Sequence, residues 1–361
     1  IDQTNMDDIN SLANLRISYR KFIADLEKKY SKYHQLKYKK NVKYALQIQE
    51  TLTENKVLCS YYLSSDASMI YIASLDKNNL IINEVFAGDQ LLNDITKFRN
   101  FIHYRLSKGY NKLSNHLYRL LIPSQKFIKN KSIVFFPDGQ LNTIPFEALS
   151  YKRTKKIHNW DTEPFLIRTN EISYGISTSL YQPYKVSELA TYSLYAPLTF
   201  RYKSGDSYRD LPNTEKEILA IDSVTINAEI KMFIGEGANK ENIINNDANV
   251  IHLATHGLID QQNPHLSKLC LAQNPNGNFL YNNDIYNLQT NSDLVTMSAC
   301  ETGLGKVSKG EGIIGLTRAW VYAGAKNIVV SYWSVSDEAT EELMTNFYTN
   351  IANKDSFSRS L

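Results

Sequence analysis

The sequence predicts an α/β protein: a mostly parallel sheet flanked by helices, preceded by helices and a small antiparallel β meander. From about residue 131 onward, short and nearly continuous apolar runs alternate with segments of helical spacing. Such a series indicates parallel strands buried on both faces, because the crossover helices cover them. Before residue 131 the apolar period is first helical and then that of short strands separated by turn residues.

Length and composition fit one large domain or two ordinary ones. The chain has 361 residues, 43% of them hydrophobic, which is enough to bury a substantial core. We expect three regions: an N-terminal helical segment over 1–55, a β meander with helices over 56–130, and the main α/β domain over 131–361. The chain starts at Ile1 rather than at a methionine, so we expect a fragment of a longer protein.

The N-terminal segment has helical spacing over residues 7–50, and within it lysines interleave with tyrosines over 28–44. A nucleic-acid groove can show this pattern, because aromatic rings stack on bases while lysines follow the phosphates. We favour a solvated helix face, because Asp25 and Glu27 interrupt the basic run. The net charge of +3 gives no strong electrostatic argument for nucleic acid or membrane, so this chain is not expected to bind either directly.

Cysteine use and hydropathy indicate a cytoplasmic protein. The three cysteines, Cys59, Cys270 and Cys300, are odd in number and form no CxxC pair. Neither a disulfide framework nor a zinc site is therefore expected. No apolar run approaches the roughly 20 residues that span a bilayer, and the N-terminus lacks the layout of a signal peptide.

Individual elements follow from period and turn residues. The meander strands are expected at 57–63, 69–73 and 80–86, and a helix at 91–121 is expected to stop before Pro123. In the main domain we expect strands at 133–136, 250–254, 294–299 and 328–333, and helices at 214–222, 311–323 and 338–350.

Two strand ends carry the chemistry. The strand at 250–254 runs into His256 and Gly257, and the strand at 294–299 runs into Cys300. Reactive groups gather past the carboxyl ends of parallel strands, and the ends of neighbouring strands lie about 5 Å apart. A nearby imidazole or a helix N-terminus activates a thiol by lowering its pKa. We predict His256 as base and Cys300 as nucleophile, with the N–H groups of Gly257 and Cys300 holding an oxyanion.

Each residue also has a simpler interpretation. A free cysteine is most often a small buried hydrophobe, and a histidine at a strand end is often merely hydrogen-bonded. His-Gly and Ala-Cys at matching ends of successive strands favour the catalytic interpretation. His252 and His256 show the HxxxH spacing of helical zinc sites, but on a strand four residues span about 13 Å, so the two cannot share one metal.

Several motifs then resemble one family. They are IHLATHG at 251–257, SACETG at 298–303, GEGIIGLTRA at 310–319, YAGA at 322–325 and WSVSDEAT at 333–340, with IPFEAL at 144–149 and LPNTEKE at 211–217 upstream. They resemble the CHAT domain, which belongs with caspases and separase. The resemblance implies a caspase-like sheet flanked by helices, a catalytic domain over 131–361, an N-terminal part of the same domain over 56–130, and the dyad of His256 and Cys300 without metal or cofactor.

Specificity is also implied by the resemblance. By similarity to separase, Asp337 occupies the position of an acidic residue that meets a basic P1 side chain, and Ser298 occupies a position that lines S1. Cleavage after Arg or Lys is therefore a hypothesis. Asp337 also suits the start of the helix at 338–350, which is the alternative for that residue.

The family suggests a regulated cysteine endopeptidase that cleaves partner proteins in a bacterial defence or signalling system, and it implies a protein substrate and an activating protein partner. CHAT domains often follow tetratricopeptide repeats, so residues 1–55 are expected to join such an array. The alternative function is a non-catalytic interaction or scaffold module of the same fold.

Overall fold

The computed structural model describes residues 15, 17–25, 43–122, 125–154, 159–183, 190–202, 205, 207–226, 228–260, 262–275, 277–298, 306–308, 312–333 and 337–361, with the backbone alone at 306–308, 312–314 and 337. The chain divides into residues 1–44 and 45–361. In the first unit residues 17–25 are helical, as predicted. Most of the basic run at 28–44 lies outside the described residues.

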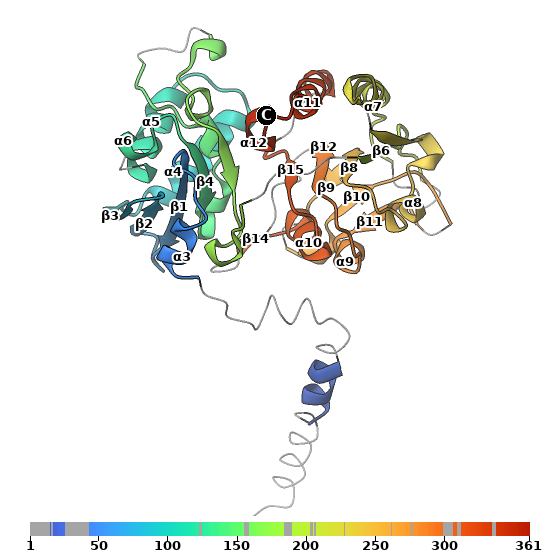
Figure 1. Cartoon of the computed structure of the whole chain (residues 1–361), viewed down its shortest axis with the longest axis horizontal. Helices are drawn as coiled ribbons and strands as arrows, with labels where there is room; N and C mark the ends of the chain where they lie inside the picture. Colours follow the sequence, from blue (N-terminus) through green and yellow to red (C-terminus); the bar gives the residue numbers. More distant parts are fainter. Residues whose placement is uncertain are drawn as a thin grey trace, which may run out of the picture. The chain divides into compact units, whose positions relative to one another are not determined.

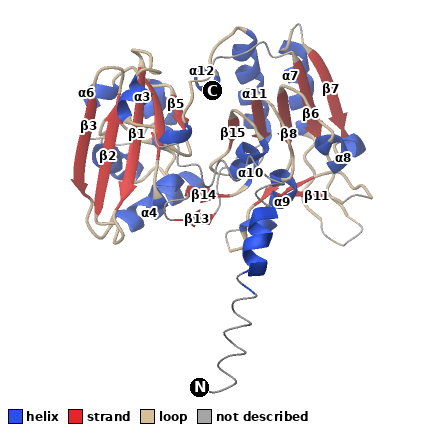
Figure 2. Cartoon of the chain, turned by 60° about the horizontal axis from the view of Figure 1, so that its bottom comes forward, coloured by secondary structure: helices blue, strands red, loops and turns tan. Residues whose placement is uncertain are grey.

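The second unit contains two five-stranded sheets, seen in Figures 1 and 2. The first has the order β3-β2-β1-β4-β5, in which β1, β2 and β3 form the predicted antiparallel meander and β4 and β5 continue in parallel with β1. The strands are β1 Lys56–Leu63, β2 Met69–Leu75, β3 Leu80–Phe86, β4 Ser132–Phe136 and β5 Ile172–Tyr174.

One face of this sheet is covered by helices, because alternate residues of its strands are apolar. Val57, Ile72 and Phe135 are among the side chains that pack against Phe98 and Leu117 of α4 and α5. The opposite face packs against a short helix, α3, over part of its area. The helices are α3 Ala45–Gln49, α4 Leu91–His103, α5 Tyr110–Leu121 and α6 Gln125–Ile128.

The predicted single helix at 91–121 is wrong, because the structure divides it into α4 and α5. Gly109, the residue before α5, has φ of 88°, and Arg105 has φ of 51°. Residues in this left-handed region cannot continue an α-helix. The break lets α5 turn back along α4, so both helices reach the same sheet face.

The second sheet has the order β15-β12-β8-β6-β7, and all of its neighbouring strands are parallel. This is the predicted buried parallel sheet, and it confirms that the strands before His256 and Cys300 are neighbours. The strands are β6 Thr191–Ala196, β7 Glu229–Ile234, β8 Val250–Ala254, β12 Leu294–Ser298 and β15 Ile328–Val330.

Helices cover both faces of this sheet, as Figure 1 shows. On one face Ile218 of α7 and Phe347 of α11 pack on Leu194 and Val250. The other face is covered by α8, α9 and α10, together with a small antiparallel sheet of β9, β10 and β11. These elements are α7 Asn213–Val224, α8 Lys240–Ile244, α9 Asn282–Tyr286, α10 Leu316–Ala323, α11 Asp337–Ala352, β9 Gly257–Leu258, β10 Lys268–Cys270 and β11 Phe279–Tyr281.

Two other predicted boundaries change. The helix predicted at 311–323 begins only at Leu316, because Gly312–Ile314 forms β14, which pairs with β13, Lys306–Ser308. The strand predicted at 328–333 ends at Val330. The three predicted regions, 1–55, 56–130 and 131–361, remain a prediction. No helix among the described residues is long and apolar enough to cross a bilayer.

The two sheets contact each other through their ends. The ring of Tyr174, the last residue of β5, lies 5.5 Å from the ring of Tyr332, which follows β15. The C-terminal helix α12, Phe357–Ser360, carries Arg359, whose guanidinium lies 3.9 Å from the Glu171 carboxylate. Residues near β15 are therefore bordered by side chains of the first sheet.

Candidate active site

His256 is held at the carboxyl end of β8 by its main chain and by its ring. The Cys270 N–H donates a hydrogen bond of 2.9 Å to the His256 carbonyl, which fixes the backbone where the strand leaves the sheet. The Nε2 atom lies 2.6 Å from the Arg209 carbonyl oxygen. The ring packs edge-on against Phe200, with centroids 4.6 Å apart. The side chain is partly exposed.

The contact with Arg209 decides which ring nitrogen can act as a base. A carbonyl oxygen only accepts hydrogen bonds, so Nε2 of His256 must carry the proton. In the neutral ring Nδ1 then holds the lone pair. A proton taken up at Nδ1 gives an imidazolium that the Arg209 carbonyl still stabilises through Nε2–H. The arrangement suits a general base whose basic atom is Nδ1.

The neighbouring strand leads to Cys300. Ser298 pairs with Ala254 in the parallel register, and the Thr255 N–H donates to the Ser298 carbonyl at 3.3 Å. Cys300 lies as many residues beyond Ser298 as His256 lies beyond Ala254. Cys300 itself lies outside the described residues, so its geometry with His256 stays a prediction.

The predicted oxyanion donor Gly257 starts β9 and pairs with Leu269 of β10. Its part in an oxyanion hole also stays a prediction, since the second donor would be the N–H of Cys300.

Ser298 is a buried polar residue. It is 8% exposed, and among the described residues its hydroxyl has no hydrogen-bond partner. It ends β12 two residues after Thr296, whose hydroxyl lies 3.0 Å from the Tyr348 hydroxyl of α11, so Ser298 lies on the sheet face covered by α7 and α11. Asp337 is the first residue of α11, and its side chain lies outside the described part of the chain. Their role in S1 stays a prediction.

A buried polar network lies on the same face of the sheet, two residues before the end of β8. His252 is fully buried, with Nε2 2.9 Å from the Glu217 carboxylate and Nδ1 3.1 Å from the Tyr348 hydroxyl. Burial raises the pKa of Tyr348 well above its usual range, so this hydroxyl keeps its proton. The network joins β8 and β12 to α7 and α11. His252 is therefore committed to Glu217 and Tyr348 rather than paired with His256 at a metal.

Sequence reasoning missed Arg209, Asp210 and Glu217. Arg209 contributes its main-chain carbonyl oxygen, and because every residue has one, the residue type at position 209 does not predict this role. Asp210 pairs with Arg201 at 2.7 Å through one carboxylate oxygen, while its other oxygen is buried and has no hydrogen-bond partner in the described part of the chain. For Glu217 a signal existed: it shares the apolar stripe of its helix with Ile218 and Ile221, where a charged residue needs a buried partner.

A cavity of about 400 Å³ lies at the carboxyl ends of β6 and β7. Pro197 and Thr199 line it after β6, and Gly235 and Glu236 line it after β7. It therefore lies at the same carboxyl edge of the sheet as His256.

Similarity to known structures agrees with this architecture. The separase of the Saccharomyces cerevisiae separase–securin complex aligns with a TM-score of 0.56 and 10% identity, over 87% of this chain and 29% of that one. A second crystal structure of the same complex gives 0.49 and 11%. At this identity the likeness concerns the fold, and the chain spans less than a third of the separase it matches. No curated protein matched.

The family model for the CHAT domain matches residues 111–361, which include β4 and β5 of the first sheet, the whole parallel sheet and both strand ends of the candidate site. The predicted resemblance is thus confirmed, and the chain belongs to the CHAT domain family.

Proposed function

We propose that this protein is a regulated cysteine endopeptidase in which His256 is the base and Cys300 the nucleophile. The observation that carries the proposal is the hydrogen bond from His256 Nε2 to the Arg209 carbonyl, beside the strand that leads to Cys300. The partly exposed ring lies just past the carboxyl end of β8 in a parallel sheet, where reactive groups gather.

The reaction follows from these groups. Nδ1 of His256 accepts the thiol proton of Cys300, and the thiolate attacks the carbonyl carbon of the scissile peptide bond. The N–H groups of Gly257 and Cys300 stabilise the oxyanion of the tetrahedral intermediate. His256 then gives its proton to the leaving amine as the C–N bond breaks, which leaves a thioester. Water, deprotonated by Nδ1, hydrolyses the thioester and restores the thiol.

Cleavage after Arg or Lys is the proposed specificity. Among the described residues the buried hydroxyl of Ser298 has no hydrogen-bond partner, and it lies on the face covered by α7 and α11. Asp337 is the first residue of α11, the helix that covers this face. A carboxylate at the start of that helix is the group that we propose to meet a cationic P1 side chain.

Regulation by a protein partner is part of the proposal. The similar separase was crystallised in a complex with securin, and a protein of that fold thus forms a stable assembly with another protein. We propose a protein substrate, an activating partner, and a place in a cytoplasmic bacterial defence or signalling system, with residues 1–55 as the junction to a tetratricopeptide array.

The test is cleavage of a peptide pool varied at P1 by the full chain, with Cys300→Ala and His256→Ala as paired variants. Cleavage after Arg or Lys that both substitutions abolish supports the proposal. Cleavage that survives Cys300→Ala contradicts it. If neither the chain nor its complex with a partner cuts any peptide, the alternative of a non-catalytic CHAT interaction module is favoured.

A further inference from the structure

The outer edge of the first sheet is an open strand, β3, which Figures 1 and 2 show on the side away from β5. Among the described residues no strand pairs with its outer side. Leu80, Ile82 and Phe86 of this strand are 47%, 66% and 73% exposed. An open edge presents unpaired N–H and C=O groups to which another strand can add, and the exposed apolar side chains favour such an addition.

β3 lacks the features that usually protect an open edge. Its sequence, LIINEVF, contains neither lysine nor proline, and its seven residues pair with β2 without a bulge. Native proteins commonly protect edge strands by such residues or by bulges. β7, the outer strand of the second sheet, has this protection, because Glu229 and Lys231 form an ion pair of 3.6 Å on it. The contrast between the two edges indicates that β3 has a partner.

The hydrogen bonds between β2 and β3 determine which main-chain groups face outward. The Asp76 N–H donates to the Asn79 carbonyl at 3.0 Å, and the Ala87 N–H donates to the Ser68 carbonyl at 2.8 Å. Hydrogen-bonded pairs alternate with non-bonded pairs along an antiparallel ladder. The odd-numbered residues of β3 therefore bond to β2, and the N–H and C=O groups of its even-numbered residues, 80 to 86, point away from the sheet.

We propose that β3 pairs in antiparallel orientation with β3 of a second copy of this chain, about a twofold axis at Asn83. The pairing joins the two first sheets into one continuous sheet. A twofold interface uses the same surface on both copies, so it closes at the dimer. The inference concerns assembly and does not depend on the proposed peptidase function.

The register follows from the outward groups and the single charge of the strand. An axis at Asn83 places Leu80 opposite Phe86 and Ile82 opposite Glu84 of the other copy, so all seven residues pair. An axis at Glu84 would set two carboxylates directly opposite each other, which is unfavourable. An axis at Ile82 would leave Phe86 opposite the turn before β3. The axis at Asn83 is therefore the best of the three.

The same register brings opposite charges together at both ends of the paired strands. Lys77 and Asp89 are each six residues from Asn83, so Lys77 of one copy comes near Asp89 of the other. Asp89 is exposed, and the Lys77 ammonium donates to the carbonyls of Gln49 and Glu50, both at 3.2 Å. In the part of the chain that the structure describes, neither Lys77 nor Asp89 is in an ion pair. Complementary charges of this kind select and orient a partner.

The size of the interface sets the expected affinity. Seven strand residues from each copy are fewer than the roughly 20–30 residues a side of a standard interface. We therefore expect a reversible dimer with a dissociation constant on the order of 10 µM.

The first test is sedimentation velocity of the full chain between about 1 and 100 µM. We expect the mass to rise with concentration from 41.3 kDa toward twice that value. Ile82→Lys places a charge on the edge and should raise the dissociation constant at least about tenfold. Ile226→Lys is the matched control, because Ile226 is 75% exposed and lies outside β3, and it should leave the dissociation constant unchanged. Circular dichroism checks that both variants are folded.

The second test reads the register by disulfide cross-linking. In the Cys300→Ala background the remaining cysteines, Cys59 and Cys270, are buried. Two copies of Asn83→Cys would face each other in a non-hydrogen-bonded pair, with Cα atoms about 4.5 Å apart, which a disulfide can bridge. Two copies of Phe86→Cys would lie six residues apart along the strands, about 20 Å, and should not cross-link. Mild oxidation and a non-reducing gel distinguish the two variants.

The outcomes are decisive in both directions. A reversible dimer that Ile82→Lys weakens and Asn83→Cys traps supports the proposal. A single species of 41.3 kDa at every concentration, equal association of Ile82→Lys and the unsubstituted chain, or species that grow beyond the dimer would each overturn it. Cross-linking of Phe86→Cys in preference to Asn83→Cys would overturn the axis at Asn83.

Discussion

Replacing Glu217 by alanine should destabilise the fold strongly. Glu217 is 2% exposed and His252 is fully buried, with 2.9 Å between carboxylate and Nε2. A buried hydrogen bond to a charged group contributes about 1.5–3 kcal/mol. Loss of one buried methylene group, Cγ, adds about 0.8 kcal/mol. Together these predict that the free energy of unfolding falls by about 2–4 kcal/mol.

Urea unfolding followed by circular dichroism measures this change. Lys216→Ala is the matched control, because Lys216 is exposed on the same helix and its loss should cost less than about 0.5 kcal/mol. Glu217→Gln should lose less than Glu217→Ala, since its amide oxygen can still accept from His252 Nε2–H. A Glu217→Ala protein within about 1 kcal/mol of the unsubstituted chain would refute the reasoning, because a buried pair of this kind cannot be lost at so low a cost.

Three further changes have defined outcomes. Gly175→Ala would place a Cβ against the ring of Phe136 and should cost about 1–3 kcal/mol in thermal or urea unfolding; an unchanged midpoint would contradict the packing. Burial raises the pKa of Cys59 to about 12, so iodoacetamide should label it only after unfolding, as peptide mass spectrometry can show. Burial opposes ionisation of Asp76, but the hydrogen bond from Lys131 and two backbone N–H groups outweigh it and lower its pKa. The stability that Asp76 contributes is therefore present above its unfolded pKa of about 3.9 and lost as the pH falls below that value. When the pH is lowered from about 5 to about 3, the free energy of unfolding of Asp76→Asn should fall less than that of the unsubstituted chain. Equal falls would show that the Asp76 carboxylate does not contribute this pH-dependent stability.

The sequence was sufficient to predict those strands and turns that depend on a local pattern of apolar and turn residues. The strands before His256 and Cys300 were predictable because each is a short apolar run, and parallel strands of that kind expose their reactive residues at one edge. The meander was predictable from its turns. Helix boundaries were less so, because Gly109 ends a run of helical spacing by its left-handed conformation rather than by a change in apolar period.

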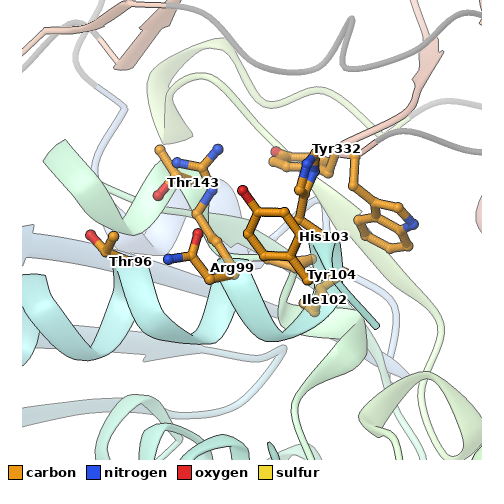
Figure 3. Close-up of a pocket in the computed structure, with 10 residues that line it drawn as sticks. Thr96, Arg99, Ile102, His103, Tyr104, Thr143 and Tyr332 are labelled. Atoms are coloured by element: carbon orange, nitrogen blue, oxygen red, sulfur yellow. The ribbon is translucent and has the colours of Figure 1, made fainter. Parts of the chain in front are cut away.

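The partners of the site residues required the tertiary structure. Glu217 and His252 are 35 residues apart in the sequence, and no local pattern predicts that this buried carboxylate contacts this buried histidine. The acceptor for His256 comes from 47 residues away. Arg99 lies in an amphipathic helix, and its sequence neighbours do not indicate that Tyr332 and Trp333 line the same cavity (Figure 3).

The main-chain anchor of His256 has a consequence for how this loop can vary. The carbonyl at position 209 belongs to the backbone, so any amino acid at that position offers the same acceptor. Substitution of Arg209 should leave the ring in place, whereas inserting or deleting one residue between Phe200 and Arg209 would move the carbonyl by about 3.3 Å and release it. Loop length, rather than residue type, is then what a designer must hold fixed when altering this loop.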